Sequence, residues 1–156
     1  MLYRWTIFVH LVGVFTFLLA HGTSVSVAFK VRAERQPARI HALLELAGVT
    51  AGWMYFGLLL LMVGGVAAGF LGHWWGHGWM WASLGTLAAQ MLLMYAFARG
   101  HYQRLRAMAG AMADGAPAED AARLAALSAG ARPWILAIAG VGGILFVLYL
   151  MMFKPF

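Results

Sequence analysis

The histidines are the residues of this chain with the most evident chemistry. There are six of them, and the chain contains no cysteine. Imidazole is a common ligand of haem iron, copper and zinc, and it can carry protons near neutral pH. The lack of cysteine excludes disulfides, cysteine-ligated iron–sulfur clusters and covalently attached c-type haem. Any metal or cofactor must therefore bind through histidine, methionine, carboxylate or backbone groups.

His10 and His21 have the spacing of residues on one face of a helix. They are eleven positions apart, and eleven helical steps return to nearly the same face roughly 16 Å further along the axis. The stripe contains His10, Gly13, Phe17, His21 and Ser24. We expect these small and polar residues to face the interior of a helix bundle. Three interpretations of the two histidines remain open: hydrogen-bonded structural residues, haem ligands, or groups that bind metal or transfer protons.

The elements that must position these histidines are four apolar runs, at about residues 5–29, 48–71, 79–98 and 134–153. Each run can cross a hydrocarbon core of roughly 30 Å. Charged residues make up 10% of the chain, against about 25% in soluble domains. We therefore predict an all-α fold, a polytopic membrane four-helix bundle that forms a single transmembrane domain over residues 1–156. The first run is interpreted as a retained helix, because it is too long for a signal peptide.

The positive charges predict the topology. Nine of the eleven lysines and arginines lie in or beside the connections 30–47 and 100–132, and only Arg4 and Lys154 lie elsewhere. The positive-inside rule makes these connections cytoplasmic, so the orientation is N-out/C-out with the 72–78 loop outside. Anionic lipid then explains the net charge without a nucleic-acid partner. In the 100–132 loop, helix three should continue until Gly115 and Pro117, and a short amphipathic helix should bury Leu124 and Leu127.

This topology sorts the histidines into two layers. The outer layer is His10, His73 and His77, and the inner layer is His21, His41 and His101. For a haem, we expect His10 and His21 to be cofactor-binding, with His73 or His77 as the outer partner. The inner partner would be His41, His101 or a methionine, and a haem with one histidine ligand is also open. The alternative is a copper site at the outer face formed by His10, His73 and His77.

Two other patterns concern packing. The segment 72–81, GHWWGHGWMW, predicts a belt of tryptophans at the membrane interface, with its histidines as ordinary loop residues unless they bind metal. Small residues four positions apart let helices approach closely in lipid. We expect such contacts at Gly65 and Gly69, at Gly85 and Ala89, and at Ala139 and Gly143.

The segments YRWTIFVHLVGVFTFLLAHG, GLLLLMVGGVAAGFLG and WMWASLGTLAAQ resemble small bacterial four-helix integral membrane proteins related to the copper resistance protein D superfamily. Members of that group often carry a histidine in the first helix followed closely by glycine, matched by His10 and Gly13. More distantly, the chain resembles the four-helix haem-binding protoporphyrinogen oxidase family, which also begins with a histidine in helix one. The chain lacks the basic residue that this family keeps within a later helix. The resemblance implies a multi-pass protein of the bacterial inner (plasma) membrane.

The sequence offers no paired-carboxylate site, no nucleophile with a base and no phosphate-binding loop, so we do not expect an autonomous enzyme. We expect an accessory subunit of, or a b-type haem-binding component in, a membrane electron-transfer or respiratory complex. The alternative is a copper-handling membrane protein. The expected partners are the lipid bilayer and other membrane subunits or further copies of the chain. The cofactor would be haem b, or alternatively copper, and a subunit without any cofactor is the third possibility.

Overall fold

The computed structural model describes residues 1–115 and 119–156, and the described residues contain helices and no strands. The long helices are α1 (Leu2–Ala33), α2 (Pro37–Leu71), α3 (Gly78–Met94) and α6 (Arg132–Phe153). Shorter elements are η1 (Trp74–Gly76), η2 (Tyr95–Arg99), α4 (Gly100–Ala113) and α5 (Glu119–Ser128). Four helical segments are long and apolar enough to cross a membrane. The prediction of an all-α four-helix membrane bundle is confirmed.

The helices extend beyond the apolar runs of the sequence. α3, η2 and α4 form one continuous helical segment from Gly78 to Ala113, as expected for a third helix that continues past its apolar run. Gly115 follows with a φ of +98°, a conformation that glycine adopts without steric cost. The expected break at Gly115 is therefore confirmed, while the break expected at Pro117 lies outside the described residues. α5 buries Leu124 and packs Leu127 against the same core, which confirms its amphipathic character.

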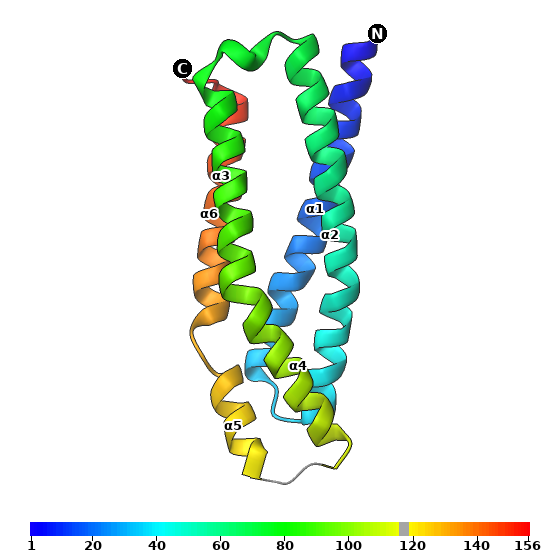
Figure 1. The fold of residues 1–156 in the computed structure, drawn as a ribbon, viewed down its shortest axis with the longest axis vertical. Coiled ribbons are helices and arrows are strands. Elements are labelled where there is room, and N and C mark those ends of the chain that lie inside the picture. The colour runs from blue at the N-terminus through cyan, green and yellow to red at the C-terminus, as the bar shows by residue number, and fades with distance from the viewer. Residues whose placement is uncertain (116–118) are drawn as a thin grey trace.

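The two ends of the bundle carry different parts of the chain (Figure 1). Both termini and the 72–78 loop lie together at one end, called here the aromatic end. The 34–36 connection and α5 lie at the other end, called here the basic end. Among the described residues, the larger of two buried clusters lies at the basic end, where α1, α2, α4 and α5 meet. Its buried members are Val27, Val31, Ile40, Leu44, Leu105, Ala109 and Leu124.

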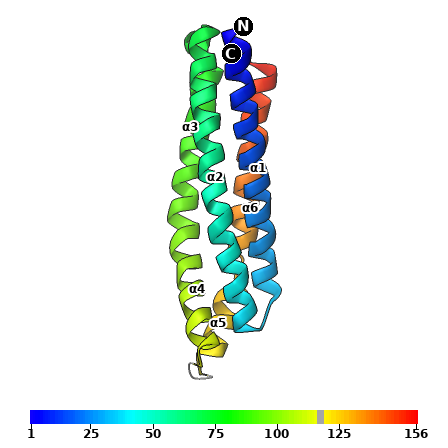
Figure 2. The same ribbon diagram turned by 90° about the vertical axis from the view of Figure 1, so that its right-hand side faces the viewer.

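The four spanning segments associate as two pairs (Figures 1 and 2). α1 packs along α2, and α3 packs along α6. α4 crosses onto α2 at the basic end, whereas α3 makes no extensive contact with α1 or α2 among the described residues. The bundle is therefore held together mainly at its basic end, and the two pairs are connected at the aromatic end by the 72–78 loop.

Glycines set the close contact between α1 and α2. A Cβ atom on Gly57 would lie 2.6 Å from the Phe17 backbone nitrogen, and one on Gly64 would lie 2.5 Å from the His10 backbone nitrogen. Gly13 similarly faces the backbone of Leu61. Because backbone atoms cannot move aside as a flexible side chain can, these glycines are required for the observed distance between the helices.

The small-residue pairs expected from the sequence have other roles. Gly65 lies against the His10 ring, Gly69 against Met80 and Trp75, and Gly143 against the Gln90 amide. Gly85 faces open space, so the contact expected at Gly85 and Ala89 was wrong within the described chain. The four-residue spacing identifies which residues share a helix face, but it does not identify what lies opposite that face.

Side chains that bind backbone carbonyls join the α3 segment to α6. The Gln90 amide donates to the carbonyl oxygens of Ala139 at 2.7 Å and Gly140 at 3.1 Å. The Arg132 guanidinium donates to the Phe97 carbonyl at 3.2 Å, within the π-helical turn η2. A π-helical turn disturbs the regular hydrogen-bond pattern of a helix, and Arg132 supplies a donor at this point.

Candidate functional site

His10 lies in the contact between α1 and α2. Its Nδ1 atom lies 2.8 Å from the Leu61 carbonyl oxygen of α2. A carbonyl oxygen only accepts hydrogen bonds, so the ring donates through Nδ1–H. In the neutral ring, Nε2 then carries the free lone pair. Nε2 has no hydrogen-bond partner among the described residues and is not among their enclosed side-chain atoms. This is the tautomer in which a histidine can act as a ligand through Nε2.

Gly65 provides the space in which the His10 ring lies. A Cβ atom at Gly65 would lie 2.8 Å from Nδ1 and 3.1 Å from Cε1 of the ring. Gly64, one residue earlier, lies against the His10 backbone. The ring is therefore held by a glycine on one side and by the Leu61 carbonyl at its Nδ1 edge. Histidine ligands of metals are commonly oriented in this way, by a hydrogen bond from the second ring nitrogen.

His21 lies on the same stripe of α1 but faces α6. Its Nε2 atom is buried without a hydrogen-bond partner among the described residues. A Cβ atom on Gly140 would lie 3.0 Å from this nitrogen, and the Met94 methyl group lies beside the same glycine. The ring stacks on Phe17 at a centroid distance of 5.8 Å. The stripe therefore faces the bundle interior as expected, but Nε2 of His21 is enclosed by α6.

The inner partners suggested by the sequence lie at the basic end. His41 Nε2 lies 3.5 Å from a Glu45 carboxylate oxygen, and the Arg106 guanidinium donates to the same oxygen at 2.6 Å. His101 packs edge-to-face on Tyr102 at a centroid distance of 5.1 Å. Among the described residues, no aromatic contact joins either ring to His21. In the described structure, His41 contacts Glu45, His101 contacts Tyr102 and His21 contacts Phe17.

His73 and His77 lie exposed in the loop at the aromatic end. The His73 backbone adopts a left-handed conformation, with a φ of 58°, directly after the Gly72 cap of α2. His77 packs near Trp74 and Trp79, with centroid distances of 5.4 and 6.4 Å. In residues 1–115 and 119–156, no three His, Cys, Asp or Glu side chains lie together as a metal site. The structure therefore does not assemble His10, His73 and His77 as a three-ligand copper site.

Two tryptophans of the 72–81 segment contact Lys154, which lies near the C-terminal end of α6. The Lys154 ammonium lies 4.0 Å from the ring centroid of Trp74 and 5.7 Å from that of Trp79. The Trp79 backbone N–H donates to the Phe156 carbonyl at 3.2 Å, and Gly78 lies against the Phe156 ring. The sequence pattern does not predict this contact, because Trp74 and Trp79 lie more than seventy positions before Lys154. The one available signal is composition, since a cation at the same membrane face as several tryptophans can form a cation–π contact.

Replacing Lys154 with methionine should reduce the stability of the packing at the aromatic end by about 0.5–1 kcal/mol, the usual free energy of an exposed cation–π interaction. The near-ultraviolet circular dichroism of the tryptophans should weaken, because Trp74 and Trp79 lose the group that orients them. Arg4→Met is the matched control, since it removes one cation at the same end without touching these rings. Equal spectra for Lys154→Met and the unaltered protein would contradict a stabilising role for this contact.

These positions limit the chemistry that the described side chains can carry out. Of the two histidines on the α1 stripe, His10 has a free ring nitrogen oriented by a backbone carbonyl, and His21 has an enclosed one. A single oriented imidazole can donate a lone pair to a haem iron or a soft metal ion. Comparison with protein-family models, curated proteins and solved structures finds no match to this chain. Any functional conclusion therefore depends on the geometry of these side chains.

Proposed function

We propose that this chain is a membrane subunit of an electron-transfer complex and that it holds a b-type haem through Nε2 of His10. The hydrogen bond from Nδ1 of His10 to the Leu61 carbonyl carries this proposal. It fixes the tautomer that leaves Nε2 as a ligand, and it orients the ring before any iron binds. When bound, the haem supplies one-electron transfer.

This chain would hold a haem through one histidine, His10, better than through His10 and His21 together. His73 and His77 lie exposed in the loop at the aromatic end, and either would supply a second ligand there. His21 is less suited, because α6 covers its Nε2 at Gly140. We therefore place the haem at the aromatic end, with His21 as a residue of the interface between α1 and α6.

The exposed surface of the spanning helices supports a role as a subunit. Between 11% and 22% of the most apolar window in each spanning segment is buried within the chain. The rest must contact lipid or other membrane proteins. Large apolar side chains exposed along the helices include Phe15, Leu59, Leu92, Ile138 and Leu145. Such a surface can accommodate partner subunits without any soluble domain.

The distribution of lysine and arginine supports an orientation in which the end that carries His10 faces outward. We place the basic end in the cytoplasm and the aromatic end outside, in a bacterial inner membrane, following the positive-inside rule. His10 would then lie near the outer face. An electron carrier of the outer compartment, or a haem of a partner subunit, would be the redox partner at this level.

Titration of haem into the detergent-purified chain tests the proposal. We expect a Soret band that saturates at equimolar haem, with the sharp reduced-state bands of a b-type cytochrome. His41→Ala, which removes a histidine at the basic end, should bind haem as the unaltered chain does. A spectrum that remains that of free haem would overturn the proposal, and so would stoichiometric copper bound at the aromatic end.

A further inference from the structure

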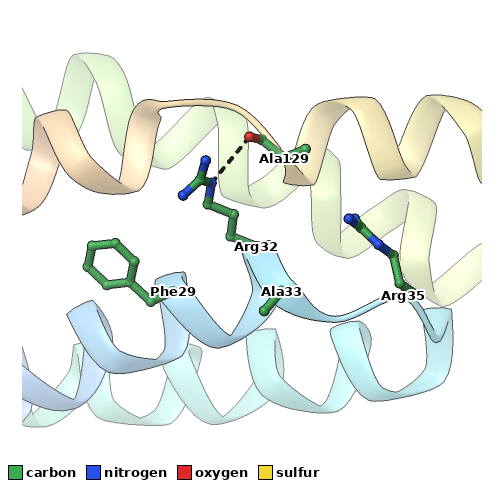
Figure 3. A pocket seen from close by; sticks show the side chains of 5 residues that line it. All are labelled: Phe29, Arg32, Ala33, Arg35 and Ala129. Atoms are coloured by element: carbon green, nitrogen blue, oxygen red, sulfur yellow. Dashed lines mark hydrogen bonds between the residues drawn. The ribbon is translucent and has the colours of Figure 1, made fainter.

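A small pocket lies at the basic end, where α1 faces the connection between α5 and α6 (Figure 3). Its volume is about 290 Å³, and it is lined by Phe29, Arg32, Ala33, Arg35 and Ala129. Pockets for drug-sized ligands begin at about 300 Å³, so this one suits a small head group rather than a macrocycle. It lies at the basic end, whereas His10 belongs to the N-terminal third of α1, which begins at the aromatic end. The pocket is therefore independent of the proposed function.

Two guanidinium groups give the pocket its charge. Arg32 donates from Nε to the Ala129 carbonyl at 3.2 Å, and this bond directs the side chain across the pocket. Its terminal NH2 groups are not used in that bond. Among the described residues, neither Arg32 nor Arg35 forms an ion pair with a carboxylate. Guanidinium groups match the geometry of phosphate oxygens and bind them through paired, charge-assisted hydrogen bonds.

The neighbouring carboxylate, Glu34, is engaged elsewhere. Its Oε1 atom accepts hydrogen bonds from the backbone N–H groups of Arg35 at 2.8 Å and Gln36 at 3.0 Å, and its Oε2 lies 3.9 Å from an Arg39 guanidinium nitrogen. The Gln36 and Arg35 N–H groups, with the charges of Arg39 and Lys30, hold the pKa of Glu34 below its usual value. Glu34 is thus ionised at neutral pH, yet it contacts the backbone of Arg35 rather than either pocket guanidinium.

The pocket lies at the level expected for lipid head groups. α1 ends at Ala33, so the arginines lie at the end of a spanning helix. Phe29 packs edge-to-face on Trp134 at a centroid distance of 4.7 Å, and the Trp134 side chain is exposed. Exposed tryptophans mark the boundary between acyl chains and head groups. With Trp134 at that boundary, Phe29 would lie on the acyl side and the guanidinium groups would lie at the depth of phosphates.

We propose that this pocket binds the phosphate group of an anionic phospholipid. Arg32 and Arg35 contact the phosphate, while Phe29 contacts the glycerol and the start of the acyl chains. Basic pockets between spanning helices are suited to anionic head groups. The Arg32–Ala129 hydrogen bond joins α1 to the connection between α5 and α6. The bound lipid would link the same two segments.

Native mass spectrometry of the full chain tests this site with three probes: dioctanoyl phosphatidylglycerol, dioctanoyl phosphatidylcholine and inorganic phosphate. We expect the unaltered protein to retain phosphatidylglycerol in preference to the other two. Arg35→Gln should weaken that binding roughly fivefold, the usual effect of one basic residue near a membrane surface. Arg35 makes no side-chain hydrogen bond in the described structure, so this variant should fold normally.

A control variant that loses the same charge elsewhere distinguishes binding in this pocket from general electrostatic attraction between the basic end and anionic lipid. The double variant Arg32→Gln/Arg35→Gln should lose more affinity than Arg35→Gln alone. The control Arg104→Gln/Arg123→Gln removes the same charge from exposed positions at the basic end and should bind nearly as the unaltered chain does. Equal losses in the two double variants would overturn the proposal. Equal binding of phosphatidylcholine, or binding of inorganic phosphate as tight as that of the lipid, would overturn it as well.

Discussion

Replacing His10 with alanine is expected to abolish haem binding by the purified chain. The variant loses the only ring nitrogen of the described spanning region that is both oriented by a backbone carbonyl and left with a free lone pair. Loss of a residue that merely orients a metal ligand costs roughly 10–100-fold in affinity, and loss of the ligand itself should cost more. Haem titration followed at the Soret band measures the effect.

His21→Ala is the control for the His10 prediction, since it removes a histidine from the same stripe of the same helix. Its Nε2 is enclosed at Gly140, so this variant should still give the Soret band. Gly65→Val should weaken haem binding without removing any ligand, because a side chain there displaces the His10 ring. Normal binding by His10→Ala, or loss of binding only in His21→Ala, would contradict the proposed ligand.

Replacing Gly57 with leucine should destabilise the α1–α2 pair by about 3 kcal/mol or more, the upper part of the range for overpacked interiors. Even the first added carbon would lie 2.6 Å from the Phe17 backbone nitrogen and 3.1 Å from the Gly13 carbonyl oxygen. α1 must therefore move away from α2, and the neighbouring contact at Gly64 is lost with it. Unfolding of the detergent-solubilised protein by sodium dodecyl sulfate measures the change.

Gly52→Leu is the matched control on the same helix. Gly52 has open space around its Cβ position, and leucine is the better helix former by roughly 0.8–1 kcal/mol. This variant should therefore be neutral or slightly stabilising. The same loss of stability in both variants would mean that glycine matters to α2 itself and not to its contact with α1.

The sequence predicted the parts of the fold that depend on local pattern. Long apolar runs require helices in lipid, because the bilayer offers no other hydrogen-bond partners to the backbone. The four-helix bundle and the burial of Leu124 on the short amphipathic helix followed from hydropathy and helical period. The stripe from His10 to Ser24 also faces other helices, as predicted. His10 forms a hydrogen bond to α2, and Ser24 lies near Thr50, which also belongs to α2.

What the sequence could not predict was the element opposite each residue. His10 and His21 lie on one stripe, yet the first faces α2 and the second faces α6. α1 is long enough to contact different helices at its two levels, and helical period carries no information about that change. The same limit applies to Gly85, which has the expected spacing but, among the described residues, no neighbouring atom within 4 Å of its Cβ position.

The tryptophans of the 72–81 segment also show that a sequence pattern does not identify the element that packs against a residue. Its tryptophans suggested an interface belt, and Trp81 is indeed exposed. Trp79, in contrast, is buried beside Leu150 of α6, and Trp74 packs against the same small cluster. The loop packs on the C-terminal end of α6, a contact between residues more than seventy positions apart in the sequence. Composition can predict that a tryptophan lies near the interface, but not which tryptophans contact a lysine distant in the sequence.

The most direct test of the proposed function is a reduced-minus-oxidised visible spectrum of the gently solubilised protein, with metal analysis of the same sample. The proposal predicts the sharp bands of a b-type cytochrome and iron equimolar with the chain. A flat spectrum without bound metal would contradict it and leave His10 as a structural link between α1 and α2. Bound copper with no haem bands would contradict it in favour of copper handling.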